Sequence, residues 1–357
     1  MKRIISLIII TSLAICSFQK IYSQGCVAIK GTAGICSRPS DAKGWELNLN
    51  NRYFRSYKHF VGTIEQKQRV EEGSEVINHS YELDVTATRT LNSRWSLAVI
   101  LPIMDFSRSS LYEHDGQTRH HTHSFGIGDA RFAAYRWMFD PKKAHKGNIQ
   151  LGAGIKLPTG NYNYQAYFYK KPDSSVLGPV DQSIQPGDGG TGFTFELNGF
   201  YNFNHAVGVY ADGFYLVNPR EVNGTSTARG GTPSASARKY NTDVMSVPDL
   251  YMARGGVAVM VNQLTFSGGL RIEGLPSKDL VGGSRGFRRP GYIISAEPSA
   301  TWVTRKASFN LSIPVALIRN RTQSNADKRQ TADTGVHRQG DAAFADYLVS
   351  AGVTFRL

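Results

Sequence analysis

Most of the chain alternates apolar and polar positions with a period of two. The pattern is clearest at the C-terminal end, where the apolar positions are Tyr347, Val349, Ala351, Val353, Phe355 and Leu357, and where Ser350, Gly352, Thr354 and Arg356 lie between them. Side chains of a strand point alternately to its two faces. One face of this segment therefore suits lipid and the other suits water.

Twelve segments share this alternation, and each is long enough to cross a membrane as a tilted strand. They lie near 44–56, 77–91, 94–106, 124–138, 147–158, 191–203, 205–217, 248–262, 264–275, 290–304, 306–318 and 342–357. A count of ten or fourteen strands fits the same pattern if the boundaries move by a few residues.

The connections between these segments alternate in length. Those near 91–94, 139–146, 202–205, 261–264 and 304–306 are tight, whereas those near 57–76, 107–123, 159–190, 218–247, 276–289 and 319–341 are long and polar. Such alternation is typical of an up-and-down barrel with an even number of strands and both ends on one side. The sequence therefore predicts an all-β protein: a single up-and-down antiparallel transmembrane β-barrel of about twelve strands, with short periplasmic turns and long extracellular loops.

A soluble β-sandwich also alternates, but it would not gather its long loops at one end, and its polar faces would lie in water. Composition favours the barrel. Glycine is frequent (36 residues), and aromatic residues make up 11% of the chain. Mean hydropathy is −0.30, and beyond the N-terminal segment no stretch is apolar enough for a membrane helix. A single barrel domain over 44–357 is expected, because no linker divides it.

The first residues have the layout of a secretory signal. A basic start, Met1 to Arg3, precedes an apolar stretch from Ile4 to Cys16 that is too short to span a bilayer. A polar exit follows, and we place the signal peptide at 1–24. The sequence thus predicts export.

The segment 25–43 contains two cysteines, Cys26 and Cys36. In an oxidising compartment two cysteines ten positions apart favour a disulfide over a metal site or a nucleophile. Lipidation of Cys26 is disfavoured, because the leucine of the lipoprotein box is missing. The segment lies either in the periplasm or in the barrel mouth, and the pattern does not choose between them.

If the apolar faces meet lipid, the polar faces line the interior. Carrying the alternation through the strands gives thirteen charged candidates for the lumen: Glu46, Arg52, Glu82, Asp84, Asp129, Arg131, Arg136, Glu196, Asp212, Arg254, Arg271, Glu273 and Glu297. Asp129 and Arg131 join this set if a β-bulge at the neighbouring glycines switches the strand's faces. Charges of both signs would line a selective pore, or would form a salt-bridge network that fills a narrow barrel.

Two glycine-rich motifs carry a resemblance to a known family. Gly126-Ile127-Gly128-Asp129 is followed by Tyr135-Arg136 and then by Gly152-Ala153-Gly154-Ile155-Lys156-Leu157-Pro158-Thr159-Gly160. This arrangement resembles the outer-membrane family labelled "putative MetA-pathway of phenol degradation", whose members are barrels described as transporters. The resemblance implies passage of small, hydrophobic or aromatic molecules. The C-terminal strand also resembles the terminal strand of outer-membrane barrels, which implies recognition by the barrel assembly machinery.

Charge adds a predicted partner. The formal net charge of +13 falls to about +10 once Lys2, Arg3 and Lys20 leave with the signal. Basic residues gather in the long loops, where we expect them to meet outer-membrane lipids and lipopolysaccharide phosphates; they include Lys278, Arg285, Arg288, Arg289, Arg319, Arg321, Lys328 and Arg329. No nucleic-acid-binding motif is present.

Catalysis is not expected. Outer-membrane phospholipases use a His-x-Ser pair, which this sequence lacks. His114, His120, His121 and His123 crowd one loop, but we predict no metal site and no cofactor there. The predicted function is passive passage of a small-molecule solute through a charged lumen in the cell outer membrane. The alternative is a non-conducting accessory barrel of a secretion or surface-protein complex.

Overall fold

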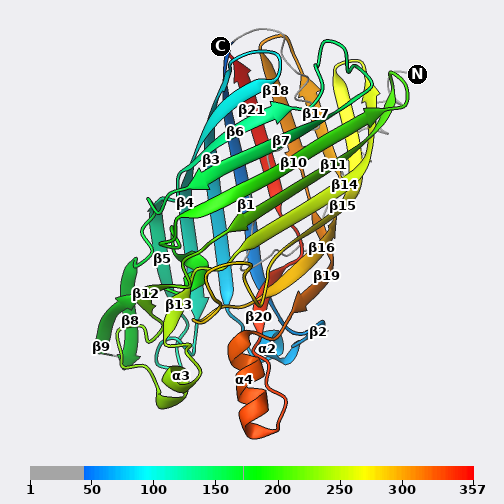
Figure 1. Ribbon diagram of the computed structural model, residues 1–357. Coiled ribbons are helices and arrows are strands. Elements are labelled where there is room, and N and C mark those ends of the chain that lie inside the picture. Colours follow the sequence, from blue (N-terminus) through cyan, green and yellow to red (C-terminus); the bar gives the residue numbers. More distant parts are fainter. Residues whose placement is uncertain (1–43, 172) are drawn as a thin grey trace, which may run out of the picture.

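Twelve antiparallel strands form a closed barrel in the computed structural model, which describes residues 44–171 and 173–357 (Figure 1). The predicted all-β barrel and its count of twelve strands are thus confirmed. The predicted signal peptide and the predicted Cys26–Cys36 disulfide lie outside the described residues.

Eight of the barrel strands are continuous. These are β1 (Gly44–Val61), β3 (Ile77–Thr90), β4 (Trp95–Ser110), β7 (Gly147–Lys156), β10 (Gly192–Asn202), β11 (Val207–Val217), β14 (Leu250–Val261) and β15 (Leu264–Leu275). The other four are interrupted pairs: β5 (His120–Ile127) with β6 (Arg131–Trp137), β16 (Gly291–Ala296) with β17 (Ser299–Val303), β18 (Ala307–Ser312) with β19 (Val315–Arg321), and β20 (Ala342–Ala345) with β21 (Val349–Arg356).

The first and last strands close the barrel. β1 pairs with β21 from Glu46 opposite Arg356 to Tyr53 opposite Val349, and it continues along β20. On its other side β1 pairs with β3 over its first twelve residues. This leaves no free strand edge along the paired stretch.

Proline accounts for two of the four interruptions. Pro298 separates β16 from β17, and Pro314 separates β18 from β19. Proline has no N–H to donate to a sheet ladder, so pairing breaks where it stands.

The β5–β6 interruption is a β-bulge. Ile103 pairs with Ile127, and Ile100 pairs with Arg131, so three residues on one strand oppose two on β4. The extra residue switches the strand's faces: Thr122 and Ser124 are buried before it, and Arg131 is buried after it.

The long connections fold back over one end of the barrel (Figure 1). They contain the strands β2 (Ile64–Glu65), β8 (Gln165–Lys171), β9 (Ser174–Pro179), β12 (Val222–Ser226) and β13 (Val244–Ser246), the 3-10 helix η1 (Gln182–Ile184), and the helices α2 (Gln68–Glu71), α3 (Ala235–Lys239) and α4 (Asn325–Thr334). No helix among the described residues is both long and apolar enough to cross a membrane.

The longest helix, α4, is well terminated. Ser324 and Asp327 form a capping box at its start, and Gly335 ends it in the left-handed conformation.

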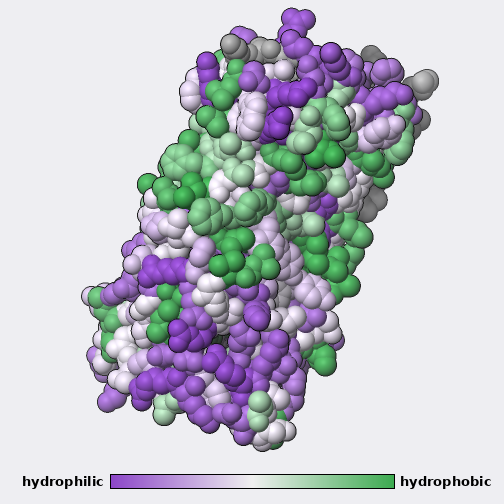
Figure 2. All heavy atoms as spheres, viewed as in Figure 1, coloured by the Kyte–Doolittle hydropathy of each residue, from purple (hydrophilic) through white to green (hydrophobic). Residues whose placement is uncertain are grey.

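The barrel wall separates apolar from polar side chains. Outward residues such as Leu97, Phe195, Leu197 and Phe309 are exposed, and Figure 2 shows hydrophobic residues gathered over the middle of the wall with hydrophilic residues dense at the long-loop end. The inward positions between them are buried and largely polar. This distribution is the reverse of a soluble protein's and fits a wall that faces lipid.

Candidate functional site

A cavity of about 250 Å³ lies inside the barrel beneath the long loops. Its sides come from inward residues of the barrel strands β1, β3, β4, β6, β7, β10, β11, β14 and β15, and loop residues, among them 185–188 after η1, line it from the long-loop end. We call it the mouth cavity. It is the place where a molecule entering from the long-loop end would meet the barrel interior.

One wall of the mouth cavity is apolar. Phe214 and Leu216 on β11 pack with Met252 and Leu250 on β14. Further apolar lining comes from Phe54, Met104, Phe106, Met245 and Leu275. Aromatic rings, thioethers and leucines make this wall a surface for apolar contacts.

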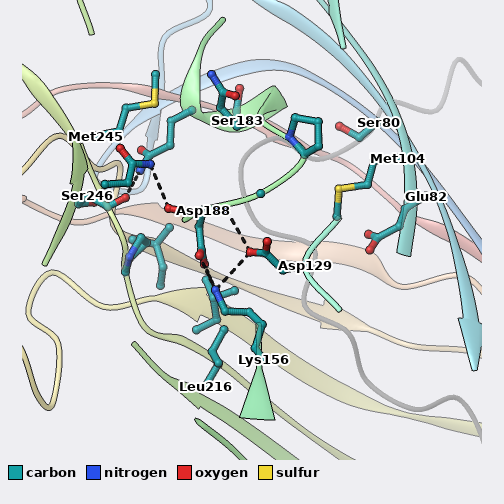
Figure 3. A pocket seen from close by; sticks show the side chains of 18 of the residues that line it. Ser80, Glu82, Met104, Asp129, Lys156, Ser183, Asp188, Leu216, Met245 and Ser246 are labelled. Atoms are coloured by element: carbon teal, nitrogen blue, oxygen red, sulfur yellow. Dashed lines mark hydrogen bonds and ion pairs between the residues drawn. The ribbon is translucent and has the colours of Figure 1, made fainter. Parts of the chain in front are cut away.

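The neighbouring part of the wall carries a lysine held between two carboxylates. Lys156 Nζ lies 3.3 Å from Asp129 Oδ2 and also donates to the carboxylate of Asp188 (Figure 3). Asp129 accepts further hydrogen bonds from the backbone N–H groups of Gly160, at 2.9 Å, and Asp188, at 3.1 Å. The lysine's charge is therefore neutralised inside the site.

The two glycine-rich motifs of the sequence meet at this wall. Thr159 donates from Oγ1 to the carbonyl oxygen of Gly128 at 2.8 Å and accepts from the N–H of Ala130 at 2.8 Å. Behind them, Gly160 and Gly187 cross so closely that a Cβ on Gly187 would lie 2.5 Å from the Gly160 carbonyl oxygen. Glycine is required at this crossing, which holds the roof of the mouth cavity against the bulge.

Above the cavity a buried ionic cluster joins four loops. We call it the loop network; it consists of Arg108, Glu113, Asp181, Arg229 and Arg289. Arg289 contacts both carboxylate oxygens of Asp181, at 2.9 and 2.7 Å, and Arg108 contacts Glu113 at 2.7 Å. Arg229 lies within 3.3 Å of both acids.

The loop network keeps its two acids ionised. Burial raises the pKa of Asp181, but the guanidinium groups of Arg108 and Arg289 outweigh burial and hold that pKa well below its ordinary value. The pKa of Glu113 is likewise lowered, because Arg108 and Arg229 outweigh the effect of burial. The loops are thus fastened by charges that persist down to acidic pH.

Most of the thirteen lumen candidates point into the barrel. Nine of them are buried: Arg52, Glu82, Asp84, Asp129, Arg131, Glu196, Arg271, Glu273 and Glu297. Asp212 and Arg254 have side chains that are 13% and 8% exposed, and Glu46, at the short-turn end, is about a third exposed.

The interior charges pair with one another in three groups. Arg254 contacts Asp212 at 2.7 Å and Glu297 at 3.1 Å, and Arg271 contacts Glu273 at 2.8 Å. Arg131 pairs with Glu196, which also accepts from the Tyr135 hydroxyl at 3.0 Å, and Arg52 lies 3.7 Å from Glu82 and 4.0 Å from Asp84. Each of the four arginines is thus paired, and because six carboxylates face them the three groups together carry a net negative charge.

The prediction for Arg136 is wrong. Its side chain lies on the outer face of β6, opposite Trp95 of β4, while Arg131, Ala133 and Tyr135 are buried inside. The sequence placed Tyr135 and Trp137 on the apolar lipid face. The bulge, however, switches faces before Arg131, so the inward set is Arg131 and Tyr135 and the outward set includes Arg136.

The loop histidines do not converge. His114 and His120 lie with their rings tilted and ring centroids 5.0 Å apart, while the His123 ring hydrogen-bonds with the Asp105 carboxylate on the outer wall. Within the described part of the chain, no three His, Cys, Asp or Glu side chains are placed to hold a metal ion.

Several of the basic loop residues find acids within the protein. Arg288 pairs with Asp279 at 2.6 Å and Arg285 with Glu221 at 2.7 Å. Arg289, Arg319 and Arg321 are paired as well. Less positive charge is therefore available to lipid phosphates at the long-loop end than the composition suggests.

Sequence reasoning missed Lys156, Asp188 and the acids of the loop network. Lys156 was detectable, because it lies inside the second glycine-rich motif at an inward parity. Asp188, Asp181 and Glu113 lie in long loops, where no period relates a residue to its partners.

Comparison with known proteins agrees with this fold. The family described as "Putative MetA-pathway of phenol degradation" matches residues 72–205. No curated protein sequence matches the chain significantly. Among solved structures, an outer membrane channel from Pseudomonas putida F1 superposes with a TM-score of 0.58 and 11% identity, covering 91% of this chain and 100% of that one. The Pseudomonas putida toluene transporter TodX gives a TM-score of 0.44 and 10% identity, covering 94% and 96%.

The fold and the apolar outer wall define an outer-membrane β-barrel of the porin-like class. Within that class the chain resembles the phenol-degradation family over residues 72–205, so the resemblance predicted from the glycine-rich motifs is confirmed. Both of those motifs fall inside the matched segment.

Proposed function

We propose that the protein is an outer-membrane channel for small, uncharged, mainly apolar molecules, including aromatic ones, which it passes passively. The observation that carries the proposal is the mouth cavity, a space of about 250 Å³ inside the barrel, with an apolar wall formed by residues such as Phe214 and Leu216. Such a space accommodates one aromatic ring with a small substituent and offers it a dry surface. The proposal assigns no catalytic step to the chain.

Charge supports an uncharged solute. The lysine of the cavity wall, Lys156, is shared by Asp129 and Asp188, and Arg131 is neutralised by Glu196. A charged solute would have to break one of these pairs or shed its own hydration, and both changes are costly. A neutral solute incurs neither cost.

The comparisons with known proteins also support the proposed channel. The superposable structure from Pseudomonas putida F1 is named an outer membrane channel, and the matching family is described by phenol degradation. We therefore place the protein in the cell outer membrane, with its long loops outside in contact with lipopolysaccharide and its short turns in the periplasm. Insertion would proceed through the assembly machinery, which reads the last strand, Val349–Arg356.

Uptake into proteoliposomes tests the proposal. Purified barrel should admit a neutral monoaromatic such as phenol faster than benzoate of similar size, and both rates should be compared with protein-free vesicles. The variant Leu216→Trp fills the apolar wall from β11, where Leu216 is 4% exposed, and should slow phenol entry at least fivefold. Leu197→Trp, the same change on the lipid-facing side of the adjacent β10, should leave the rate unchanged.

Equal entry of phenol and benzoate, or an unchanged rate in Leu216→Trp, would contradict the proposed selectivity. A folded barrel that admits no solute would favour the second candidate, a non-conducting accessory barrel. One observation favours that candidate: the interior arginines and acids pair with one another within a strand or between nearby strands, as the charges of a side-chain-filled barrel would.

A further inference from the structure

Two arginines point outward from the barrel wall at the short-turn end. Arg89 of β3 lies opposite Trp45, and Arg136 of β6 lies opposite Trp95. Both tryptophans are on the outer surface, 49% and 42% exposed. Arginine on a lipid-facing wall is unfavourable unless it lies at headgroup level, where tryptophan also concentrates.

The two outward arginines differ from those of the interior in what they contact. The Arg89 guanidinium stacks on the Trp45 ring at 5.4 Å, and that of Arg136 on Trp95 at 5.5 Å. Among residues 44–171 and 173–357, neither guanidinium has a hydrogen-bonded or ionic partner. Stacking uses the face of the guanidinium and leaves its N–H edge available to an acceptor outside the protein.

The neighbouring turn adds three lysines. Residues 138–146 join β6 to β7 and carry the exposed side chains of Lys142, Lys143 and Lys146. The single acid of this turn, Asp140, accepts from the backbone N–H of Lys142 at 3.1 Å, which fastens the turn. Arg89, Arg136 and the three lysines thus supply five cations, against the one acid of this turn.

A hollow lies beneath the same turn. Lys143 and Lys146 line it together with Phe139, Ile149 and Tyr201. Ile149 and Tyr201 belong to the exposed apolar wall, so the hollow opens both to the lysines and to the lipid-facing surface. A molecule with an anionic head and an apolar tail matches this combination.

We infer that this edge binds an anionic phospholipid of the leaflet at the short-turn end. The site, here the basic belt, consists of Arg89, Arg136, Lys142, Lys143 and Lys146. The guanidinium edges take the phosphate oxygens, the lysines supply the attraction that favours a net negative headgroup, and acyl chains lie along Leu97 and Ile149. The inference rests on the membrane placement in the proposed function and does not depend on transport.

Charge complementarity selects this occupant over an acidic protein. The arginines are set into the wall beside exposed apolar residues, with Arg89 paired to Leu97 and Arg136 paired to Leu151. A soluble partner approaching from the water would reach the lysines of the turn but not the lipid-covered arginines.

Quenching of Trp95 by brominated lipids tests the inference. A reporter barrel carrying Trp45→Phe, Trp137→Phe and Trp302→Phe retains Trp95 beside Arg136. Reconstituted in mixed bilayers, it should be quenched by brominated phosphatidylglycerol at a mole fraction several-fold lower than by brominated phosphatidylcholine. Adding Arg89→Gln and Arg136→Gln together with Lys142→Gln, Lys143→Gln and Lys146→Gln removes the whole basic belt and should bring the ratio close to one. The matched control, Arg305→Gln with Lys306→Gln, removes two exposed cations from another turn at the same end and should retain the preference.

Resistance of the folded band to heating in gels confirms that each variant has folded. No preference in the parent reporter, or the same preference after all five cations of the basic belt are replaced, would overturn the inference. If soluble polyglutamate shifts Trp95 fluorescence in phosphatidylcholine bilayers while phosphatidylglycerol gives no preference, the edge binds an acidic protein instead. A barrel that prefers phosphatidylglycerol but admits no solute would support lipid binding at the basic belt and would contradict only the transport proposal.

Discussion

Replacing Asp181 by asparagine should release the loops that cover the mouth cavity. Asp181 is 3% exposed and meets three arginines of the loop network: Arg289 at 2.7 Å, Arg229 at 3.3 Å and Arg108 at 3.5 Å. The asparagine keeps the size of the side chain and one acceptor oxygen but removes the negative charge. Glu113, which contacts Arg108 and Arg229, would then be the remaining acid of the network.

The expected cost follows from the burial of the pair. Removing one partner of a buried ion pair costs about 3–5 kcal/mol, because it leaves the other charge uncompensated. We expect a value near the lower end, since Arg108 and Arg229 keep Glu113 and the amide still accepts a hydrogen bond. About 3 kcal/mol corresponds to roughly a hundredfold change in the local opening equilibrium.

Hydrogen exchange over residues 180–188 measures this opening directly, because the segment is held by the network and forms the roof of the cavity. In Asp181→Asn its amides should exchange about a hundredfold faster than in the parent. Asp333→Asn is the matched control: its partner Lys239 is exposed, and surface pairs contribute about 0–1 kcal/mol. Combining Asp181→Asn with Arg289→Gln should cost less than the sum of the single changes.

The reasoning fails if exchange over 180–188 in Asp181→Asn stays within threefold of the parent. It also fails if the control variant opens the segment as much. The first result would show that the crossing of Gly160 and Gly187 holds the roof without help from the ionic cluster, and the second would show that the opening is not specific to the network.

Three further predictions concern the same loops. Burial and the neighbouring His120 lower the pKa of His114 to about 4, so the folded loops favour the neutral ring. Protection of the β8–β9 amides from hydrogen exchange should therefore be full above pH 6.5 and fall between pH 6.5 and 4. The variant His114→Gln should abolish this pH dependence. Gly187→Ala should destabilise the roof by about 1–3 kcal/mol through overpacking, whereas Gly126→Ala, which meets open space, should not, as thermal unfolding would show. The pKa values of Glu113 and Asp181 are lowered, so the contribution of the loop network to the stability of the loops should be constant from pH 7 to about 5 and be lost as pH falls below about 4. Limited proteolysis of the loops in the His114→Gln background measures this loss.

The barrel was predictable because strand periodicity is a local property. Each inward residue of a strand fixes the face of every second neighbour, which is why Glu82 and Asp84, or Arg271 and Glu273, were placed inside together. The same rule misplaced Arg136, because one inserted residue reverses all faces beyond it. The glycines indicated a bulge, but the sequence did not reveal on which side of Arg131 the switch falls.

The mouth cavity was not predictable in the same way. Asp188 approaches Lys156 across 32 residues of sequence, and Arg229 approaches Glu113 across 116. These contacts depend on how long loops pack on one another, and loops have no period. The glycine-rich motifs were identified by their resemblance to a family. The structure gives them a physical role, because their contacts hold the β5–β6 bulge against the roof of the cavity.

The polar residues of the outer wall define how the barrel sits in a membrane. On β3 the outward positions between His79 and Arg89 are Tyr81, Leu83, Val85 and Ala87. Ten residues at about 3.4 Å each span about 34 Å along the strand, which at a tilt of about 40° is about 26 Å along the membrane normal. The apolar band of outer-membrane barrels is about 25 Å tall. Arg89 and Arg136 therefore lie at one edge of the hydrocarbon layer.

An outward arginine costs about 0–1 kcal/mol at that edge and about 2–4 kcal/mol at the midplane. The basic belt is thus where the membrane tolerates positive charge on the wall and where lipid phosphates lie within reach.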